Sequence, residues 1–468
     1  MNRKELESKH VDYLAHSESW KFYRAAYEGT KALLDYGIVK RLTDESNEDY
    51  AARLKTIFGF NLSERLIDLV IGYLFSKPTD YDFESLKNDK LFNMFIKNCD
   101  KQGNNFEDYM QNQMLISKVY GYVGLLINKA KIDEQRTIEM DALEKIYPYI
   151  TSFSPLSIYD WTYELINGSK VLIYLKLFDD TGNFNLWWPD KWEIWATDDD
   201  KEYILHDSGV NNLGIIPFVV LKNDANTVTM GGNSDIKEVA RHDSALINNA
   251  HSANEIIAYN GFPMLQVPDK GQNDSRNIKV EPRAVLEYDR KFPESKASWL
   301  STEVSAPITA IIEWNEIIIL EAYKSISASF MNDNGAGVES GEAKKRAFQS
   351  FNSSLAKSAS VLEQAELNII NIWLMWQDNQ QAFESISISR TKNYDIQSLS
   401  DDLDNFTAAM QMVKSETFNQ EVQKTTVGRT LPDLSRETSK IIDDEINTAS
   451  VEINLDDMDS ANDESENE

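Results

Sequence analysis

The feature that most constrains the fold of this chain is a pair of helix patterns that flank a shorter, strand-like insert. The first pattern covers residues 233–260, with Asn233 or Ser234 as its N-cap, and its apolar side chains recur at three- and four-residue steps. The second covers residues 305–328. At 1.5 Å per residue each helix is roughly 35–40 Å long, so the two can pair antiparallel. The sequence therefore predicts a two-helix rod that carries residues 261–304 at its tip.

The second helix of the rod is apolar around most of its circumference. Its sequence, ITAIIEWNEIIILEAYKS, leaves a narrow polar stripe of Glu313, Glu316 and Lys324, so one partner helix cannot cover the apolar surface. The acidic residues and Asn315 interrupt the run well before about 18 apolar residues, which excludes a membrane span. Both a core helix of one large domain and a helix packed between the subunits of a ring fit this pattern. The candidate contact residues of such a ring are Ile311, Trp314 and Ile318 on this helix and Ile236, Leu246 and Ile257 on the first.

Composition narrows the setting in which the chain works. Its 468 residues suffice for two to four domains, on a prior of roughly 150 residues each. A single cysteine, Cys99, excludes an intramolecular disulfide, and residues 1–10 lack the apolar core of a signal peptide. We therefore expect synthesis in a reducing cytoplasm and no membrane anchor.

The charge of the chain argues against tight binding of nucleic acid. The formal net charge is -29, whereas affinity for a duplex comes largely from Lys and Arg side chains that neutralise phosphates. The same charge does not exclude a protein that DNA slides past. Residues 441–468 are rich in Asp, Glu, Asn and Ser, so we expect a disordered acidic tail whose simplest role is solubility.

The regions outside the rod predict an α+β fold that is mainly helical and contains a small antiparallel sheet. Residues 1–130 favour helices, one of them from Asn105 to about Val119, and residues 123–225 switch to period-two patterns with turn signals such as Asn167-Gly168. The expected strands are Val123–Ile127, Lys170–Leu177, Phe184–Trp188, Trp192–Ala196, Tyr203–His206 and Ile215–Leu221.

After the rod, a Gly-rich loop at residues 329–341 leads into a long helix, straight or kinked, from about Glu342 to Asn379. The expected elements beyond it are a strand at Ser385–Ser389, a helix from about Ser400, a loop at Thr425–Arg429 and a last helix after Leu434.

No constellation of residues predicts catalysis, a cofactor or a metal. The Gly-rich loop has Glu342 where a phosphate-binding loop needs lysine, and a helix precedes it. The five histidines lack the spacing of a zinc helix. A calcium-binding loop would need a glycine and a closing glutamate after Asp401, Asp402 and Asp404, and neither follows at the required spacing. An acidic first turn of a helix explains these three residues better. We expect that the chain is not an enzyme.

The order of these segments resembles the portal proteins of tailed bacteriophages, and it is most similar to the siphophage type. The resemblance covers about residues 10–440, and it lies in the ordered set rather than in one diagnostic motif. Its most specific parts are Trp20–Tyr27 with Glu28-Gly29, Asn61–Pro78, Ile215–Val220, and Ser340–Lys345 at the start of the long helix.

The resemblance implies a ring, usually of twelve copies, at one vertex of the capsid, through which the genome is packaged and ejected. It also implies how the chain is divided. The implied parts are a wing at 1–232, stem helices at 233–260 and 305–328, a clip at 261–304, a tunnel loop at 329–341, a long wing helix and strand at 342–397, and a crown at 398–440.

The partners implied are other copies of the chain, the major capsid and scaffolding proteins, the terminase packaging motor, a head-tail adaptor, and double-stranded DNA that passes without sequence specificity. The tunnel loop would project into the channel. Its candidate DNA-facing residues are Asn332, Asp333, Asn334, Glu339 and Ser340. Two other classes remain open from the sequence, a cytoplasmic acidic α+β enzyme and a scaffold protein that forms no ring.

Overall fold

The structure is a computed structural model in which two compact units, Met1–Tyr394 and Asp395–Glu468, are distinct. It describes residues 2–448 except 42, 44, 132–136, 199–201, 225–229, 261–263, 269–284, 289–297, 301–302, 329–340, 395–398 and 432–435. The fold class is α+β with long helices and small sheets, which confirms the class predicted from the sequence.

The first part of the chain is mainly helical, as expected. Its helices are α1 (Arg3–Leu6), α2 (Val11–Glu28), α3 (Thr30–Tyr36), α4 (Asn47–Leu54), α5 (Leu62–Leu74), α6 (Lys90–Lys97) and α7 (Phe106–Tyr120). The predicted limits of α7 are confirmed by its caps, because the Asn105 side chain accepts from the Asp108 amide at 2.9 Å and Gly121 adopts φ +100 at the other end.

Two antiparallel sheets occupy the strand-rich region, where the sequence predicted one. The first has the strand order β3-β2-β9 and the second β4-β5-β6-β7-β8. Their bounds are β2 (Tyr122–Asn128), β3 (Tyr149–Phe153), β4 (Ile158–Ile166), β5 (Ser169–Phe178), β6 (Phe184–Trp187), β7 (Lys191–Thr197), β8 (Tyr203–Val210) and β9 (Phe218–Lys222), with α8 (Ile138–Glu144) and the 3₁₀ turn η2 (Pro155–Ser157) between strands.

The sequence did not predict β3 and β4. The reason for β4 lies in its register with β5, which shifts between Ile158 and Asp160 and again between Thr162 and Tyr163. Each such irregularity breaks the alternation of inward and outward side chains by which a strand is recognised. The turn signal at Asn167-Gly168 was correct, since both residues have positive φ and join β4 to β5.

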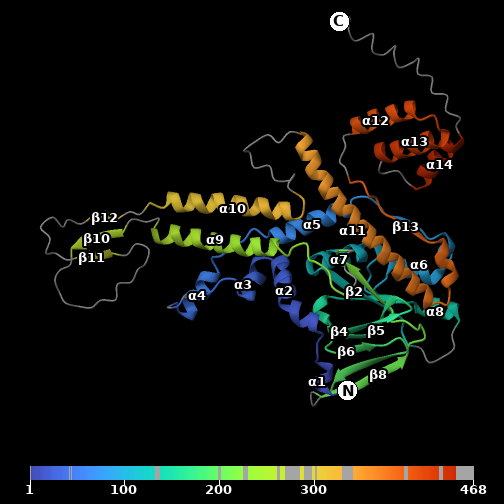
Figure 1. Cartoon of the computed structure of the whole chain (residues 1–468), viewed down its shortest axis with the longest axis horizontal. Helices are drawn as coiled ribbons and strands as arrows, with labels where there is room; N and C mark the ends of the chain where they lie inside the picture. The colour runs from blue at the N-terminus through green and yellow to red at the C-terminus, as the bar shows by residue number, and fades with distance from the viewer. Residues whose placement is uncertain are drawn as a thin grey trace, which may run out of the picture. The chain divides into compact units, whose positions relative to one another are not determined.

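The predicted rod is confirmed as two antiparallel helices, α9 (Val239–Asn260) and α10 (Ser305–Ser325) (Figure 1). Their lengths, 22 and 21 residues, correspond to about 32 Å each. The predicted start of the first helix at residue 233 was wrong, because residues 235–238 form turns before α9 begins. Between the two helices, β10 (Met264–Pro268) pairs parallel with β11 (Val285–Tyr288) and antiparallel with β12 (Ser298–Leu300).

The long helix after the rod is α11 (Gly341–Met375), which ends about four residues before the predicted limit. A 3₁₀ segment, η4 (Gln380–Ser385), leads from it into β13 (Ser387–Ser389), which pairs antiparallel with β1 (Asp80–Asp82). The 3₁₀ turn η1 (Glu84–Leu86) follows β1. Pairing between β1 and β13 joins the first hundred residues to the end of this unit.

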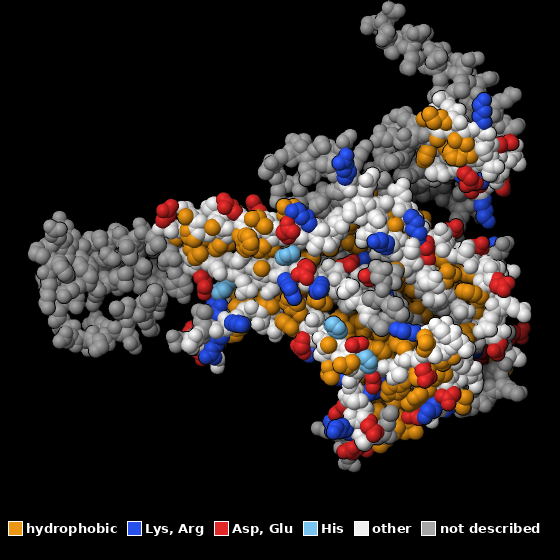
Figure 2. Space-filling view, viewed as in Figure 1, with side chains coloured by type: hydrophobic (Ala, Val, Ile, Leu, Met, Phe, Trp, Pro, Cys, Tyr) orange, Lys and Arg blue, Asp and Glu red, His pale blue; other side chains and the backbone are white. Residues whose placement is uncertain are grey.

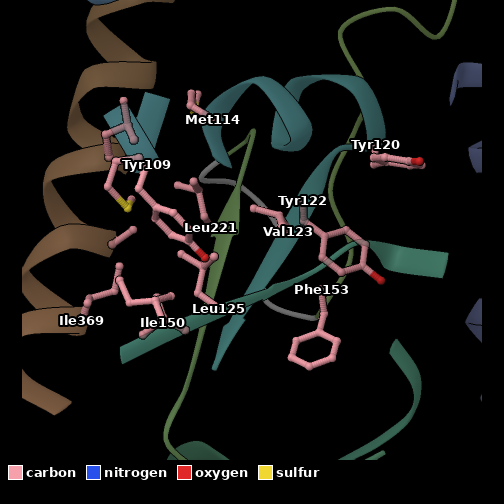
Figure 3. Close-up of a cluster of buried hydrophobic side chains, with 14 of the residues drawn as sticks. Tyr109, Met114, Tyr120, Tyr122, Val123, Leu125, Ile150, Phe153, Leu221 and Ile369 are labelled. Carbon is pink, nitrogen blue, oxygen red and sulfur yellow. The ribbon is translucent and has the colours of Figure 1, made fainter. Parts of the chain in front are cut away.

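The main core of this unit surrounds β2, whose residues are buried on both faces as far as Ile127. Figure 3 shows Tyr109 and Met114 of α7, Leu125 of β2 and Ile369 of α11 in this cluster. The indole Nε1 of Trp376, just after α11, donates to the Ile127 carbonyl at 2.9 Å. The long helix is therefore fixed to the central strand at its C-terminal end.

The second unit contains α12 (Leu399–Met412), α13 (Glu416–Thr430) and α14 (Arg436–Thr448). The helix from about Ser400 and the last helix after Leu434 are confirmed. The loop predicted at Thr425–Arg429 was wrong, because α13 continues through it with the Thr426 hydroxyl donating to the Val422 carbonyl at 2.8 Å. The disordered tail predicted from residue 441 also began too early, since α14 extends to Thr448.

Candidate functional site

The rod is anchored at its base by a buried lysine. The Nζ atom of Lys118, on α7, donates to Asp235 Oδ2 at 2.9 Å, to Asn223 Oδ1 at 3.1 Å and to Ser358 Oγ of α11 at 3.1 Å. All three ammonium protons thus have acceptors, which a buried charge requires. Asp235 lies in the turns that precede α9, so this lysine joins the start of the rod to α7 and α11. We call the part of the first unit outside the rod the body.

A second anchor comes from α9 itself. The carboxylate of Asp243 is buried and accepts from the backbone amides of Leu62 and Ser63, each at 2.8 Å. These amides open α5, whose own N-cap residue, Asn61, makes no capping bond. Burial raises the pKa of Asp243, and the bonds from Ser63 and Leu62 partly offset that rise. A residue of the rod therefore caps a helix of the body.

The chain enters the rod through a close backbone contact. A Cβ atom on Gly232 would lie 2.1 Å from the carbonyl oxygen of Gly121, and one on Gly121 would lie 2.3 Å from that of Gly232. Only glycine fits at both positions. The turn after α7 and the segment before α9 are thereby held against each other.

Further out, α9 is covered on two opposite sides. On one side Asn249 Nδ2 donates to Asn315 Oδ1 of α10 at 2.8 Å. On the other side Ile247 packs in a small core with Leu33 and Val39, and Arg53 Nη1 donates to His251 Nε2 at 2.8 Å. Residues 247 and 251 each lie two positions from Asn249, which places them about 160° around the helix from it. We call residues 30–58, which contain α3 and α4, the arm.

Arg53 also holds the arm together internally. Its Nε and Nη2 atoms each lie 2.6 Å from one oxygen of the Glu45 carboxylate, and both side chains are largely buried. This paired contact with Glu45 raises the pKa of Arg53 above its ordinary value.

Four large apolar side chains on α9 and α10 are exposed to solvent. Ile257 is 50% exposed, Ile312 53%, Trp314 56% and Ile317 49%. Hydrophobic side chains accordingly form a row along α10 in the space-filling view (Figure 2). Ile312 and Trp314 lie two residues apart, which places them about 160° apart around α10, so the exposed apolar side chains occupy more than one side of this helix. Exposed apolar side chains gathered on one element mark a site of association.

The six residues expected at a ring interface separate into two groups. Trp314 and Ile257 are exposed, and Ile311 is half-buried. Ile236, Leu246 and Ile318 are buried in the main core of their own chain, so they have no surface to offer to a second copy. The sequence missed Ile312 and Ile317, although both belong to the same apolar run of α10. The tunnel-loop residues Asn332, Asp333, Asn334, Glu339 and Ser340 lie outside the described residues.

Other kinds of site were sought in the described part of the chain. No group of three or more His, Cys, Asp or Glu side chains there is placed to hold a metal ion. No described helix is long and apolar enough to cross a membrane.

Comparisons with known proteins give distant structural neighbours only. No family model matches the chain, and neither does any curated protein. Among solved structures, one neighbour comes from the virion of a native gene transfer agent particle, with a TM-score of 0.41 and 10% identity over 86% of this chain and 99% of that one. A second neighbour comes from the neck of the empty particle, computed with C6 symmetry, with a TM-score of 0.44 and 9% identity over 82% of this chain and 95% of that one. A third comes from the neck of the native particle, computed with C12 symmetry, with a TM-score of 0.44 and 10% identity over 82% of this chain and 89% of that one. Scores of this size decide neither the family nor the function.

Proposed function

We propose that this chain is the subunit of a portal-type ring, located at one capsid vertex of a tailed-phage virion, through which double-stranded DNA is packaged and ejected. The observation that carries the proposal is the rod, whose base is bonded to the rest of the first unit while Ile257, Ile312, Trp314 and Ile317 along its two helices are exposed. A rod that is fixed at one end and carries exposed apolar side chains along its length needs neighbours there, and a ring of copies supplies them.

The energetics are of the right order for assembly. Full burial of one large aliphatic or aromatic side chain contributes about 1.5–3 kcal/mol. Since the four side chains are already half-buried, completing their burial adds about 1 kcal/mol each, or about 4 kcal/mol for each subunit. This gain must exceed the loss of translational and rotational freedom on association. Closure of a ring helps, because every subunit then makes two contacts.

The remaining parts of the chain fit the same role. The net charge of -29 suits a conduit that must not hold phosphate tightly. In such a ring residues 1–232 and 342–397 form the wing, α9 and α10 the stem, residues 261–304 the clip and residues 398–440 the crown. The clip is the proposed contact with the terminase motor and the head-tail adaptor, and twelve is the expected copy number.

Mass photometry and negative-stain microscopy of the full chain test the proposal. The wild-type chain should form closed rings with rotational symmetry. Changing Ile312 and Ile317 together to Asp should abolish the rings while the circular dichroism spectrum stays unchanged, because both positions face solvent in the single chain. Leu143→Asp is the matched control, since Leu143 is exposed on α8, away from the rod. A wild-type chain that remains monomeric at micromolar concentration contradicts the proposal.

A further inference from the structure

The side on which the two helices of the rod touch is marked by a hydrogen bond. Asn249 Nδ2 of α9 donates to Asn315 Oδ1 of α10 at 2.8 Å, so these two residues point towards each other. Ile318 and Ala322 lie within about 60° of Asn315 around α10, and both are buried, as this orientation requires. The direction of any other residue of the rod follows as an angle from Asn249 or Asn315, at about 100° per residue.

Ile257 and Ile312 lie on one broad face of the rod. Ile257 comes eight residues after Asn249, a rotation of about 800°, which is equivalent to +80°. Ile312 comes three residues before Asn315, a rotation of about -300°, which is equivalent to +60°. Because the helices are right-handed and antiparallel, positive rotation on each leads from their line of contact to the same side of the pair. Both side chains are exposed there, and we call this side face one.

The opposite broad side of the rod also carries exposed apolar side chains, all of them on α10. Trp314 lies at about -100° from Asn315, Pro307 at about -80° and Ile317 at about -160°, near the outer edge. All three are exposed. We call this side face two.

The rest of the chain leaves both faces open at these residues. The arm covers a third side of α9, the one turned away from α10, through the Arg53–His251 bond and the contacts of Ile247. A single partner that lies on one face would leave the apolar side chains of the other face in solvent. Two neighbours, one on each side of the rod, cover both faces.

The area of each face also favours two neighbours. The exposed residues from Pro307 to Ile317 span about 16 Å of α10, and two helices side by side are about 20 Å wide. A contact between two such faces therefore buries roughly 600 Å² in total, about half of the roughly 1,200 Å² at the lower limit of stable interfaces. One such contact is too small to hold a two-fold dimer. In a closed ring every copy makes two, and it leaves only when both are broken.

We infer that face one of each copy packs against face two of the next copy. The inference rests on the proposed ring and names the surfaces that meet in it. Copies related by rotational symmetry lie at the same height along the ring axis, so each rod has the rods of the two adjacent copies as its neighbours. A contact between two different faces is heterologous, and its repetition around an axis closes a ring.

Loss of either face should prevent assembly. Ile257→Asp with Ile312→Asp disables face one, and Trp314→Asp with Ile317→Asp disables face two. Each pair should lower the ring fraction in mass photometry at least about tenfold, because the contact would bury charges that have no partner.

The matched control for these substitutions is Leu165→Asp with Val210→Asp. Both residues are exposed and apolar, and they lie on β4 and β8, outside the rod. The ring fraction of this variant should stay within about twofold of the wild type, as expected for a change on an open surface.

A mixture of two disabled chains tests whether the contact is heterologous. The first chain carries Ile312→Cys on face one, and Ile317→Asp disables its face two. The second chain carries Trp314→Cys on face two, Ile257→Asp to disable its face one, and a tag that makes it heavier. A flexible bis-maleimide should join one first chain to one second chain and give no larger species, because each chain has one working face. The native Cys99 does not interfere, since it is fully buried and burial raises the pKa of its thiol.

The cross-linking control replaces Ile312→Cys in the first chain by Leu143→Cys. Leu143 is exposed on α8, outside the rod. This chain should give at most about a tenth of the cross-linked product, because a thiol there has no neighbour in the contact.

The outcomes separate this contact from the ring itself. A wild-type chain that stays monomeric overturns the proposed function and the contact with it. When the wild type forms rings, three results overturn the contact and leave the ring standing. They are rings that survive the loss of either face, products that join two first chains or two second chains, and a mixture that gives no more product than the Leu143→Cys control.

Discussion

At the scale of single residues, the pair Arg390–Glu366 shows what holds α11 to the two-stranded sheet. Arg390 Nη2 lies 2.5 Å from Glu366 Oε1, and both side chains are almost fully buried. The Tyr81 hydroxyl donates to Glu366 Oε1 at 3.3 Å and accepts from Arg390 Nη2 at 3.2 Å. Two opposite charges removed from water are tolerable only when each satisfies the other in this way.

Breaking this pair should be costly, and breaking a nearby exposed pair should not. Glu366→Gln leaves the Arg390 charge buried without a counter-charge, so we expect the free energy of unfolding to fall by roughly 3–5 kcal/mol. Lys392→Ala is the matched control, because Lys392 pairs with Glu363 at 2.6 Å but is exposed, and its loss should cost about 1 kcal/mol or less. Urea denaturation measures both. Equal losses in the two variants would contradict the assignment.

These residues could not be identified from the sequence. The chain has 76 Asp and Glu residues, and nothing in the spacing of Glu366, Asp243 or Lys118 marks them as buried. Their roles depend on contacts between segments far apart in the chain, such as the 240 residues that separate Lys118 from Ser358. Local patterns carry no information about such contacts.

At the scale of elements, patterns with a clear period were predicted well. The rod, α7, α11, the strands β5 to β7 and the turn at Asn167-Gly168 all lie close to their expected positions. The start of α9 was placed too early because the preceding turns are held by the tertiary bond from Lys118 to Asp235. Periodicity detects a helical face, but it does not show where a tertiary contact interrupts the helix.

The capping of α5 by Asp243 gives a prediction about coupling between two helices. Asp243→Ala should lower the free energy of unfolding by about 2 kcal/mol, because it leaves the Leu62 and Ser63 amides buried without acceptors. Hydrogen exchange should then quicken both at the start of α5 and along the first half of α9. Asn105→Ala is the control, since Asn105 caps only its own helix, α7, and should quicken exchange there alone. Unchanged exchange in α9 of Asp243→Ala would show that the cap does not anchor the rod.

At the scale of the whole molecule, the sequence indicated that the rod needs partners but not which of its faces is free. Ile236, Leu246 and Ile318 repeat with helical spacing as regularly as Ile257 and Trp314 do. The body covers the first group near the base of the rod and leaves the second in solvent. The apolar residues have the same spacing at the buried end of each helix as at the exposed end. Their spacing therefore does not show which of them are covered by the body.

The last prediction concerns passage of DNA and the Gly-rich loop at residues 329–341, which we propose projects into the channel. Three glycines among Asn, Asp and Ser give its backbone a wide choice of conformations. Asn332, Asn334 and Ser340 can donate brief hydrogen bonds to phosphate, whereas Asp333 and Glu339 repel phosphate and so keep the binding of DNA weak.

Changing Asp333 and Glu339 to Lys should therefore slow packaging or ejection, because each lysine adds attraction for the DNA backbone. Rings should still form, because neither substitution changes a residue of α9 or α10. The readouts are the amount of DNA packaged per particle and infectivity in a complementation assay, with Asp333→Asn and Glu339→Gln as the control that removes charge without reversing it. Unaltered packaging, retention and infectivity in the lysine variant would assign the loop to a simple connection between α10 and α11.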